Sequence, residues 1–82
     1  MGIAINKKSL SIALHHLSLS YKEFGEEVGI SAKTGKITKF MNPEKYGCYV
    51  KKKESDAILS KLNRLSDENK YLFDDIFYFY NK

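Results

Sequence analysis

Residues 20–41 constrain the fold of this chain more than any other segment does. Ser20 and Glu23 have the spacing of a capping box, in which each side chain accepts a hydrogen bond from the backbone N–H of the other residue. Gly29 predicts the end of this first helix, because glycine adopts the left-handed conformation at little cost. Apolar residues at helical spacing then resume and continue to Met41. The segment therefore predicts two short helices joined by a tight turn.

Apolar periodicity predicts further helices on both sides of this pair. Helices are expected over about residues 7–17 and 55–65, and Ser66 is a favourable N-cap for an aromatic helix over about residues 67–80. Residues 46–50 are either a short strand or an irregular crossing, and the pattern favours neither. With 43% apolar residues the chain can bury a core without metal or disulfide support. We therefore expect an all-α fold, a compact five-helix arrangement in a single domain that spans residues 1–82.

The positive charge of the chain is concentrated in one segment. The net charge is +4, but residues 33–53 alone carry seven lysines and one glutamate, a net charge of +6. Residues 1–32 are neutral overall, and residues 54–82 carry a net charge of −2. Clustered lysines attract polyanions more strongly than evenly spread ones do. The alternative is a solvated, lysine-rich surface.

The second helix of the central pair, projected at about 100° per residue, has an apolar and a basic side. If Ile37 points into the core, small residues and lysines point outward. Such a surface could contact thymine methyl groups, guanine edges and phosphates of DNA. The candidate DNA-contacting residues are Ser31, Ala32, Lys33, Thr34, Gly35, Lys36, Thr38, Lys39, Asn42, Lys45, Lys51, Lys52 and Lys53. Arg64 is the only arginine and glutamine is absent, so phosphate contacts and DNA shape are expected to carry much of the affinity.

Residues 20–41 resemble the helix-turn-helix of the lambda-repressor/Cro (XRE) family. The residues that carry the resemblance are Phe24, Gly25, Val28, Gly29, Ile30, Ser31, Ile37 and Phe40. Two extra residues, most simply Ala32 and Lys33, separate the turn from Ile37. The resemblance implies a lambda-repressor-like domain that places its recognition helix in the major groove of double-stranded DNA. It further implies a transcription regulator, such as a repressor or Cro-like protein of a phage or other mobile element.

The aromatic stretch near the end of the chain leaves a second function open. It has more apolar residues than one helix stripe needs, which is typical of either a wedged core helix or an interface. The candidate interface residues are Phe73, Phe77, Tyr78 and Tyr80. The alternative function is a protein-binding modulator, similar to an anti-repressor or an antitoxin, and a homodimer or another protein is then the partner.

No motif in the sequence predicts an enzyme, a cofactor or a metal site. His15 and His16 would diverge by about 100° on a helix and cannot chelate one ion together. Cys48 is the only cysteine, as suits a reducing cytosol, so we expect a cytoplasmic protein. No apolar run approaches the length of a membrane span, and no membrane association is expected.

Overall fold

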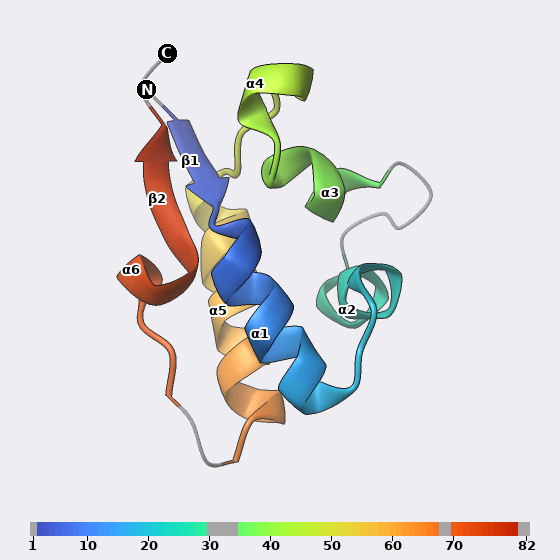
Figure 1. The fold of residues 1–82 in the computed structure, drawn as a ribbon. Coiled ribbons are helices and arrows are strands. Elements are labelled where there is room, and N and C mark those ends of the chain that lie inside the picture. Colours follow the sequence, from blue (N-terminus) through green and yellow to red (C-terminus); the bar gives the residue numbers. More distant parts are fainter. Residues whose placement is uncertain (1, 30–34, 68–69, 81–82) are drawn as a thin grey trace.

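A computed structural model describes residues 2–29, 35–67 and 70–80 of the chain. Within these residues the chain forms six helices and one two-stranded sheet (Figure 1). The elements in chain order are β1 (Gly2–Ile5), α1 (Lys7–Leu17), α2 (Tyr21–Val28), α3 (Lys36–Phe40), α4 (Pro43–Tyr46), α5 (Lys52–Leu65), α6 (Phe73–Ile76) and β2 (Phe77–Tyr80). The fold is mostly helical, as expected, but it is not all-α, because the first and last elements form a sheet.

Helices α1 and α2 have the expected bounds, and local capping explains why. The side chain of Asn6 accepts the N–H of Ser9 at 3.2 Å at the start of α1. At the start of α2, the Ser20 hydroxyl accepts the N–H of Glu23 at 3.1 Å, and the Glu23 carboxylate accepts the N–H of Ser20 at 3.0 Å. Gly29 follows α2 with a φ of 88°. The predicted capping box and glycine stop are both confirmed.

Helix α3 is shorter than the sequence pattern suggested. Gly35 precedes it with a φ of 60°, in the left-handed region, so this glycine caps the helix instead of forming part of its outer face. The predicted residues Ser31, Ala32, Lys33 and Thr34, and the two-residue insertion, lie outside the described residues. Helix α5 begins at Lys52, three residues before the expected start at Ser55.

The expected helix over residues 67–80 is wrong. Ser66 ends α5 instead of beginning a new helix, and α6 is a single short turn. The strand β2 then pairs antiparallel with β1, with Gly2 opposite Tyr80. Alternating aromatic residues suit a pleated strand, and this pairing satisfies backbone groups of both chain ends. The pairing of β1 with β2 was not predicted from the sequence.

The segment that precedes α5 is joined to the sheet by a backbone hydrogen bond. Val50 donates its backbone N–H to the carbonyl of Ile3 at 2.8 Å and forms an isolated bridge. The alternative left open by the sequence is thus resolved as an irregular crossing with one bridged residue. In this arrangement β1 lies between Val50 and β2. One edge of β2 pairs with β1, and the opposite edge of β2 faces away from it.

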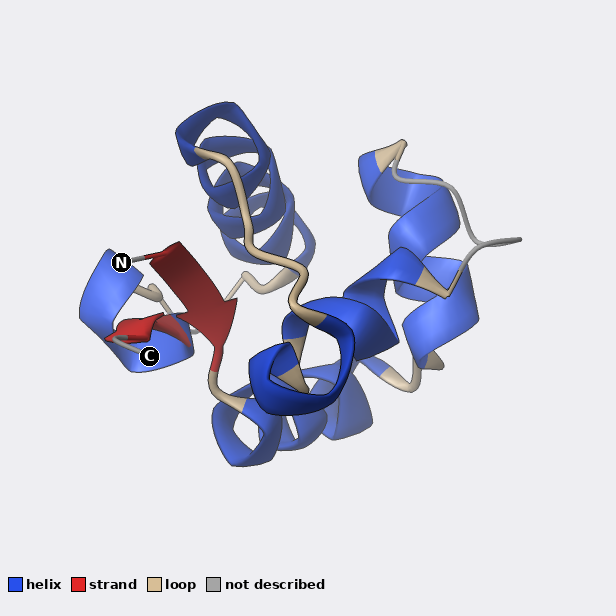
Figure 2. Ribbon diagram, turned by 90° about the horizontal axis from the view of Figure 1, so that it is seen from above, coloured by secondary structure: helices blue, strands red, loops and turns tan. Residues whose placement is uncertain are grey.

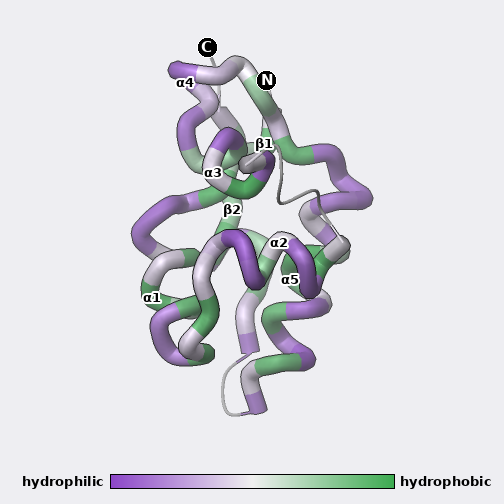
Figure 3. Tube along the Cα trace, turned by 90° about the vertical axis from the view of Figure 1, so that its right-hand side faces the viewer, coloured by the Kyte–Doolittle hydropathy of each residue, from purple (hydrophilic) through white to green (hydrophobic). Residues whose placement is uncertain are grey.

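One cluster of buried apolar side chains forms the core and draws on most of the elements. It contains Ile5, Leu10, Ala13, Leu14, Phe24, Ile37, Phe40, Met41, Val50, Ile58, Leu62, Ile76 and Phe77. Figures 1 and 2 both show the sheet and α6 at one side of the molecule and α2 at the other. Hydrophobic and hydrophilic residues alternate along α5, which has one side in the core (Figure 3). None of the helices in residues 2–29, 35–67 and 70–80 is long and apolar enough to cross a membrane.

Candidate nucleic-acid interface

Helices α2 and α3 pack together through the side chains that the sequence placed inside. Phe24 and Phe40 are fully buried, and Ile37 is 4% exposed. Gly25 is also buried in α2, where a small residue allows close approach to a neighbour. The inward direction of Ile37, which the helical projection assumed, is confirmed. Thr38, which lies to the side of this buried stripe, is exposed, and Lys39, on the opposite side of α3, is half-buried.

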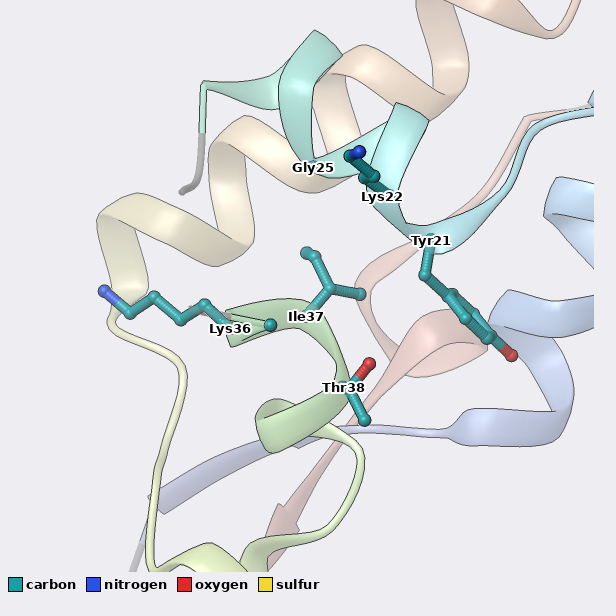
Figure 4. Close-up of a pocket in the computed structure, with 7 residues that line it drawn as sticks. Tyr21, Lys22, Gly25, Lys36, Ile37 and Thr38 are labelled. Carbon is teal, nitrogen blue, oxygen red and sulfur yellow. The ribbon is translucent and has the colours of Figure 1, made fainter. Parts of the chain in front are cut away.

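Lys36 is not a freely solvated ammonium. Its Nζ atom lies 2.9 Å from a carboxylate oxygen of Glu54, near the start of α5, and 5.7 Å from the centre of the Phe40 ring. Figure 4 shows its side chain extending from α3 toward the neighbouring helix start. Glu54 also accepts the backbone N–H of Lys51 at 3.0 Å. One carboxylate thus joins α3 to the first turn of α5.

This ion pair changes the pKa values of both partners. The hydrogen bond from Lys36 to Glu54, together with the carboxylate charge, raises the pKa of Lys36. Burial, the largest single effect on Glu54, favours its protonated form. Together, the hydrogen bonds from Lys51 and Lys36 outweigh the effect of burial, so the pKa of Glu54 is lowered. Both groups are therefore charged at neutral pH and hold each other in place.

The other predicted residues on α3 and α4 differ in how freely they could contact a ligand. Lys39 is half-buried in the last turn of α3. The side-chain amide of Asn42 donates to the carbonyl of Thr38 at 2.8 Å, so it closes the end of the helix. Lys45 is exposed, and its Nζ atom lies 5.2 Å from the centre of the Tyr46 ring. Of this group, Thr38 and Lys45 are the most accessible.

The three consecutive lysines at the start of α5 are all exposed. Lys52 forms an ion pair with Asp56 at 2.8 Å, but both side chains are well solvated, so the pair is a weak constraint. Lys51 and Lys53 complete the group. Because Glu54 connects this helix start to Lys36, and α4 packs on α3, the described lysines of residues 35–53 lie on neighbouring elements.

A hollow of about 90 Å³ lies between α2 and α3 (Figure 4). Its lining residues are Tyr21, Lys22, Gly25, Gly35, Lys36, Ile37 and Thr38. Lys22 adds an exposed cation in the first turn of α2, and the sequence reasoning missed it. Glutamates on the same helix offset the charge of Lys22, so residues 1–32 have no net charge. A count of net charge by segment therefore did not reveal this lysine.

The predicted interface residues do not form one surface. Phe77 is 2% exposed and belongs to the core, while Phe73 is half-buried and stacks on it with ring centres 5.1 Å apart. Phe79, which the prediction omitted, is 60% exposed. Phenylalanine and tyrosine alternate over residues 77–80, and neighbouring residues of a strand lie on opposite faces. This alternation is the sequence signal that could have identified Phe79. Tyr78 and Tyr80 lie on the other face of β2, beside α4.

No family model, curated protein or solved structure matches this chain. Within the described residues, no group of three or more histidine, cysteine, aspartate or glutamate side chains is placed to hold a metal ion.

Proposed function

We propose that this chain is a DNA-binding transcription regulator that inserts α3 into the major groove of duplex DNA. The carrying observation is the packing of α2 on α3, with Ile37 and Phe40 inside, Thr38 exposed, and the lysines of α3, α4 and the α5 start on neighbouring elements. The resemblance of residues 20–41 to the lambda-repressor/Cro (XRE) helix-turn-helix supports the same proposal. A role as a phage-type repressor or Cro-like protein rests on that resemblance alone.

In this proposal the exposed lysines neutralise phosphates and α3 sets the register on the duplex. Lys45, Lys51 and Lys53 reach phosphate oxygens as mobile point charges, because a lysine ammonium has no fixed geometry. Thr38 offers a methyl group and a hydroxyl to base edges. Lys36 binds a phosphate only by exchanging its contact with Glu54. Glu54 therefore limits the charge that α3 presents.

The salt dependence of DNA binding tests the proposal. Fluorescence anisotropy with a 30-base-pair duplex should give an affinity that falls steeply with salt concentration, because phosphate contacts release counterions. Replacing both exposed residues in Lys45→Ala/Lys53→Ala should make the slope shallower by about 0.9 for each lost phosphate contact.

A matched control is Lys8→Ala, which removes an exposed lysine from α1. This variant should keep the wild-type slope. Absence of duplex binding at low salt would contradict the proposal, and so would an equal change of slope in the α1 control.

A second candidate function is protein binding through the outer edge of β2, either to a second copy of this chain or to the target of an anti-repressor or antitoxin. The observation that favours it is the exposure of Phe79 (60%) on β2 and of Leu72 (71%) immediately before α6. The residues of β2 include no charge and no proline, the usual features that protect an exposed edge from pairing.

Sedimentation tests this second candidate. A dimeric wild type that becomes monomeric on Phe79→Asp, but not on Ile12→Asp at an exposed site of α1, would support self-association through β2. Phe77 is unsuitable for this test, because a charge at that buried position would disrupt the core. A monomeric wild type would contradict the homodimer.

A further inference from the structure

A polar cleft separates the α3–α4 turn from β2. It has a volume of about 240 Å³ and is lined by Met41, Asn42, Pro43, Glu44, Lys45, Tyr78 and Tyr80. Figures 1 and 3 both place α4 at the end of the molecule where β1 begins and β2 ends. The cleft thus brings together residues that the sequence assigned to two separate sites, Asn42 and Lys45 on one wall and two tyrosines on the other.

Tyrosine rings are concentrated around this cleft. Tyr78 is 40% exposed, and Tyr80 is half-buried with its ring centre 6.0 Å from that of Tyr49. Tyr46 lies on α4 beside Lys45. Four of the six tyrosines of the chain therefore lie on or next to these walls. Aromatic faces beside lysines are the recognition elements that proteins use for unpaired bases, which stack on the rings.

The cleft has one charged group that suits the phosphate of a nucleotide and one that suits its base. Lys45 supplies an exposed cation for a phosphate. The Glu44 carboxylate interacts with the Tyr80 hydroxyl, and its remaining lone pairs can accept a hydrogen bond from an exocyclic amino group, as acidic side chains do with cytosine. An unpaired base exposes its ring face for stacking on aromatic side chains, whereas a base that stays paired and stacked in a duplex does not.

We propose that this cleft binds one unpaired base of a single-stranded nucleic acid. The base stacks on Tyr78 and Tyr80, Lys45 contacts its phosphate, and Glu44 selects bases that carry an exocyclic amino group. The site goes beyond the proposed duplex contacts of α3 and has Lys45 in common with the duplex surface. A cationic ligand would also suit tyrosines and a carboxylate, but Lys45 and the net charge of +6 over residues 33–53 oppose it.

Anisotropy with labelled twelve-nucleotide strands tests the cleft. Wild type should bind oligo-deoxycytidine more tightly than oligo-thymidine, because thymine has no exocyclic amino group to donate to Glu44. Tyr78→Ala should weaken oligo-deoxycytidine binding by roughly 5- to 150-fold, the range expected for the loss of one stacked base. Phe79→Ala is the matched control, since it removes the neighbouring exposed ring on the opposite face of β2 and should leave binding unchanged.

A second variant keeps the test decisive if Tyr78→Ala does not fold. Glu44 is exposed, so Glu44→Ala should fold normally and should abolish the preference for cytidine over thymidine. Equal losses in Tyr78→Ala and Phe79→Ala, or an unchanged preference in Glu44→Ala, would overturn the cleft proposal. Duplex binding without single-strand binding would overturn the cleft alone. Single-strand binding without duplex binding would instead overturn the proposed regulator function.

Discussion

At the scale of single residues, Gly2 is required by the ring that lies on it. A Cβ atom at this position would come within 2.4 Å of the Tyr49 ring, much closer than atoms can pack. We expect Gly2→Ala to destabilise the protein by about 1–3 kcal/mol, the usual cost of overpacking, because the ring must move off β1. Urea denaturation of wild type and variant measures the difference.

A double-mutant cycle gives the control. In a Tyr49→Ala background the ring is absent and only the 2.9 Å contact with the Cβ atom of residue 49 remains, so Gly2→Ala should then cost less. An equal cost in both backgrounds would show that the ring does not lie on Gly2.

Glu54 should make stability depend on acid pH. Its folded-state pKa lies below the ordinary value of 4.5, so its stabilising contribution is fully present above pH 4.5 and is lost as the pH falls through the lower folded value. We expect Glu54→Gln to cost about 1 kcal/mol at pH 7, allowing for the partial exposure of Lys36. The cost should shrink below pH 4, as measured by denaturation at a series of pH values.

The same substitution releases Lys36 from its carboxylate, so duplex binding should become tighter and more salt-dependent if α3 contacts phosphate. A stability difference between wild type and Glu54→Gln that is constant from pH 7 to pH 3 would contradict the assigned ion pair.

At the scale of elements, the sequence predicted those helices whose signals are local. The box formed by Ser20 and Glu23, and the glycine after it, lie within one turn of the ends that they define, so α2 was placed correctly. Lys51 and Glu54 have the same spacing at the start of α5. Only one of the two capping-box hydrogen bonds can form there, the one that the Glu54 carboxylate accepts, because the lysine side chain has no acceptor. Recognising this carboxylate half of the capping box in the sequence would have placed the predicted start of the helix earlier. It would also have pointed to Glu54 as the carboxylate that pairs with Lys36.

The capping box of α2 gives a testable consequence. We expect Ser20→Ala to destabilise the protein by about 1 kcal/mol, because the Glu23 N–H loses its acceptor at the start of an eight-residue helix. Thermal denaturation measures this cost, and Ser60→Ala on the exposed side of α5 is the control, with little expected effect.

The hydrogen bonds of Ser20 also lower the pKa of Glu23, with the backbone contribution larger than that of the hydroxyl. An NMR titration of the carboxylate should therefore show a pKa closer to its ordinary value in Ser20→Ala. Equal stabilities of Ser20→Ala and Ser60→Ala would contradict the capping role.

The strand β2 shows the limit of local prediction. Its aromatic residues fit either an apolar helix or a strand, and what decides between them is β1, at the opposite end of the chain. The candidate site shows the same limit. A count of charges located the lysines of residues 33–53, but only the fold places Tyr78 and Tyr80 opposite Lys45.

At the scale of the whole molecule, the pairing of the first and last strands closes the fold. Forming it requires the unfolded chain to bring its two ends together, which carries a large loop-closure entropy. A flexible linker that joins residue 82 to residue 1 would remove that entropy from the unfolded state. We expect such a cyclised chain to be more stable by at most about 4 kcal/mol, as measured by chemical denaturation.

The control for cyclisation is the linear chain with the same linker at its end, which should match the stability of the unmodified protein. The gain should also depend on the sheet. In Gly2→Ala, where the Tyr49 ring is displaced from β1, the native ends are held less firmly and cyclisation should offset part of the lost stability. A cyclised chain no more stable than its linear control would mean that the ends are not paired. The placement of Tyr78 and Tyr80 beside α4, on which the cleft depends, would then lose its structural basis.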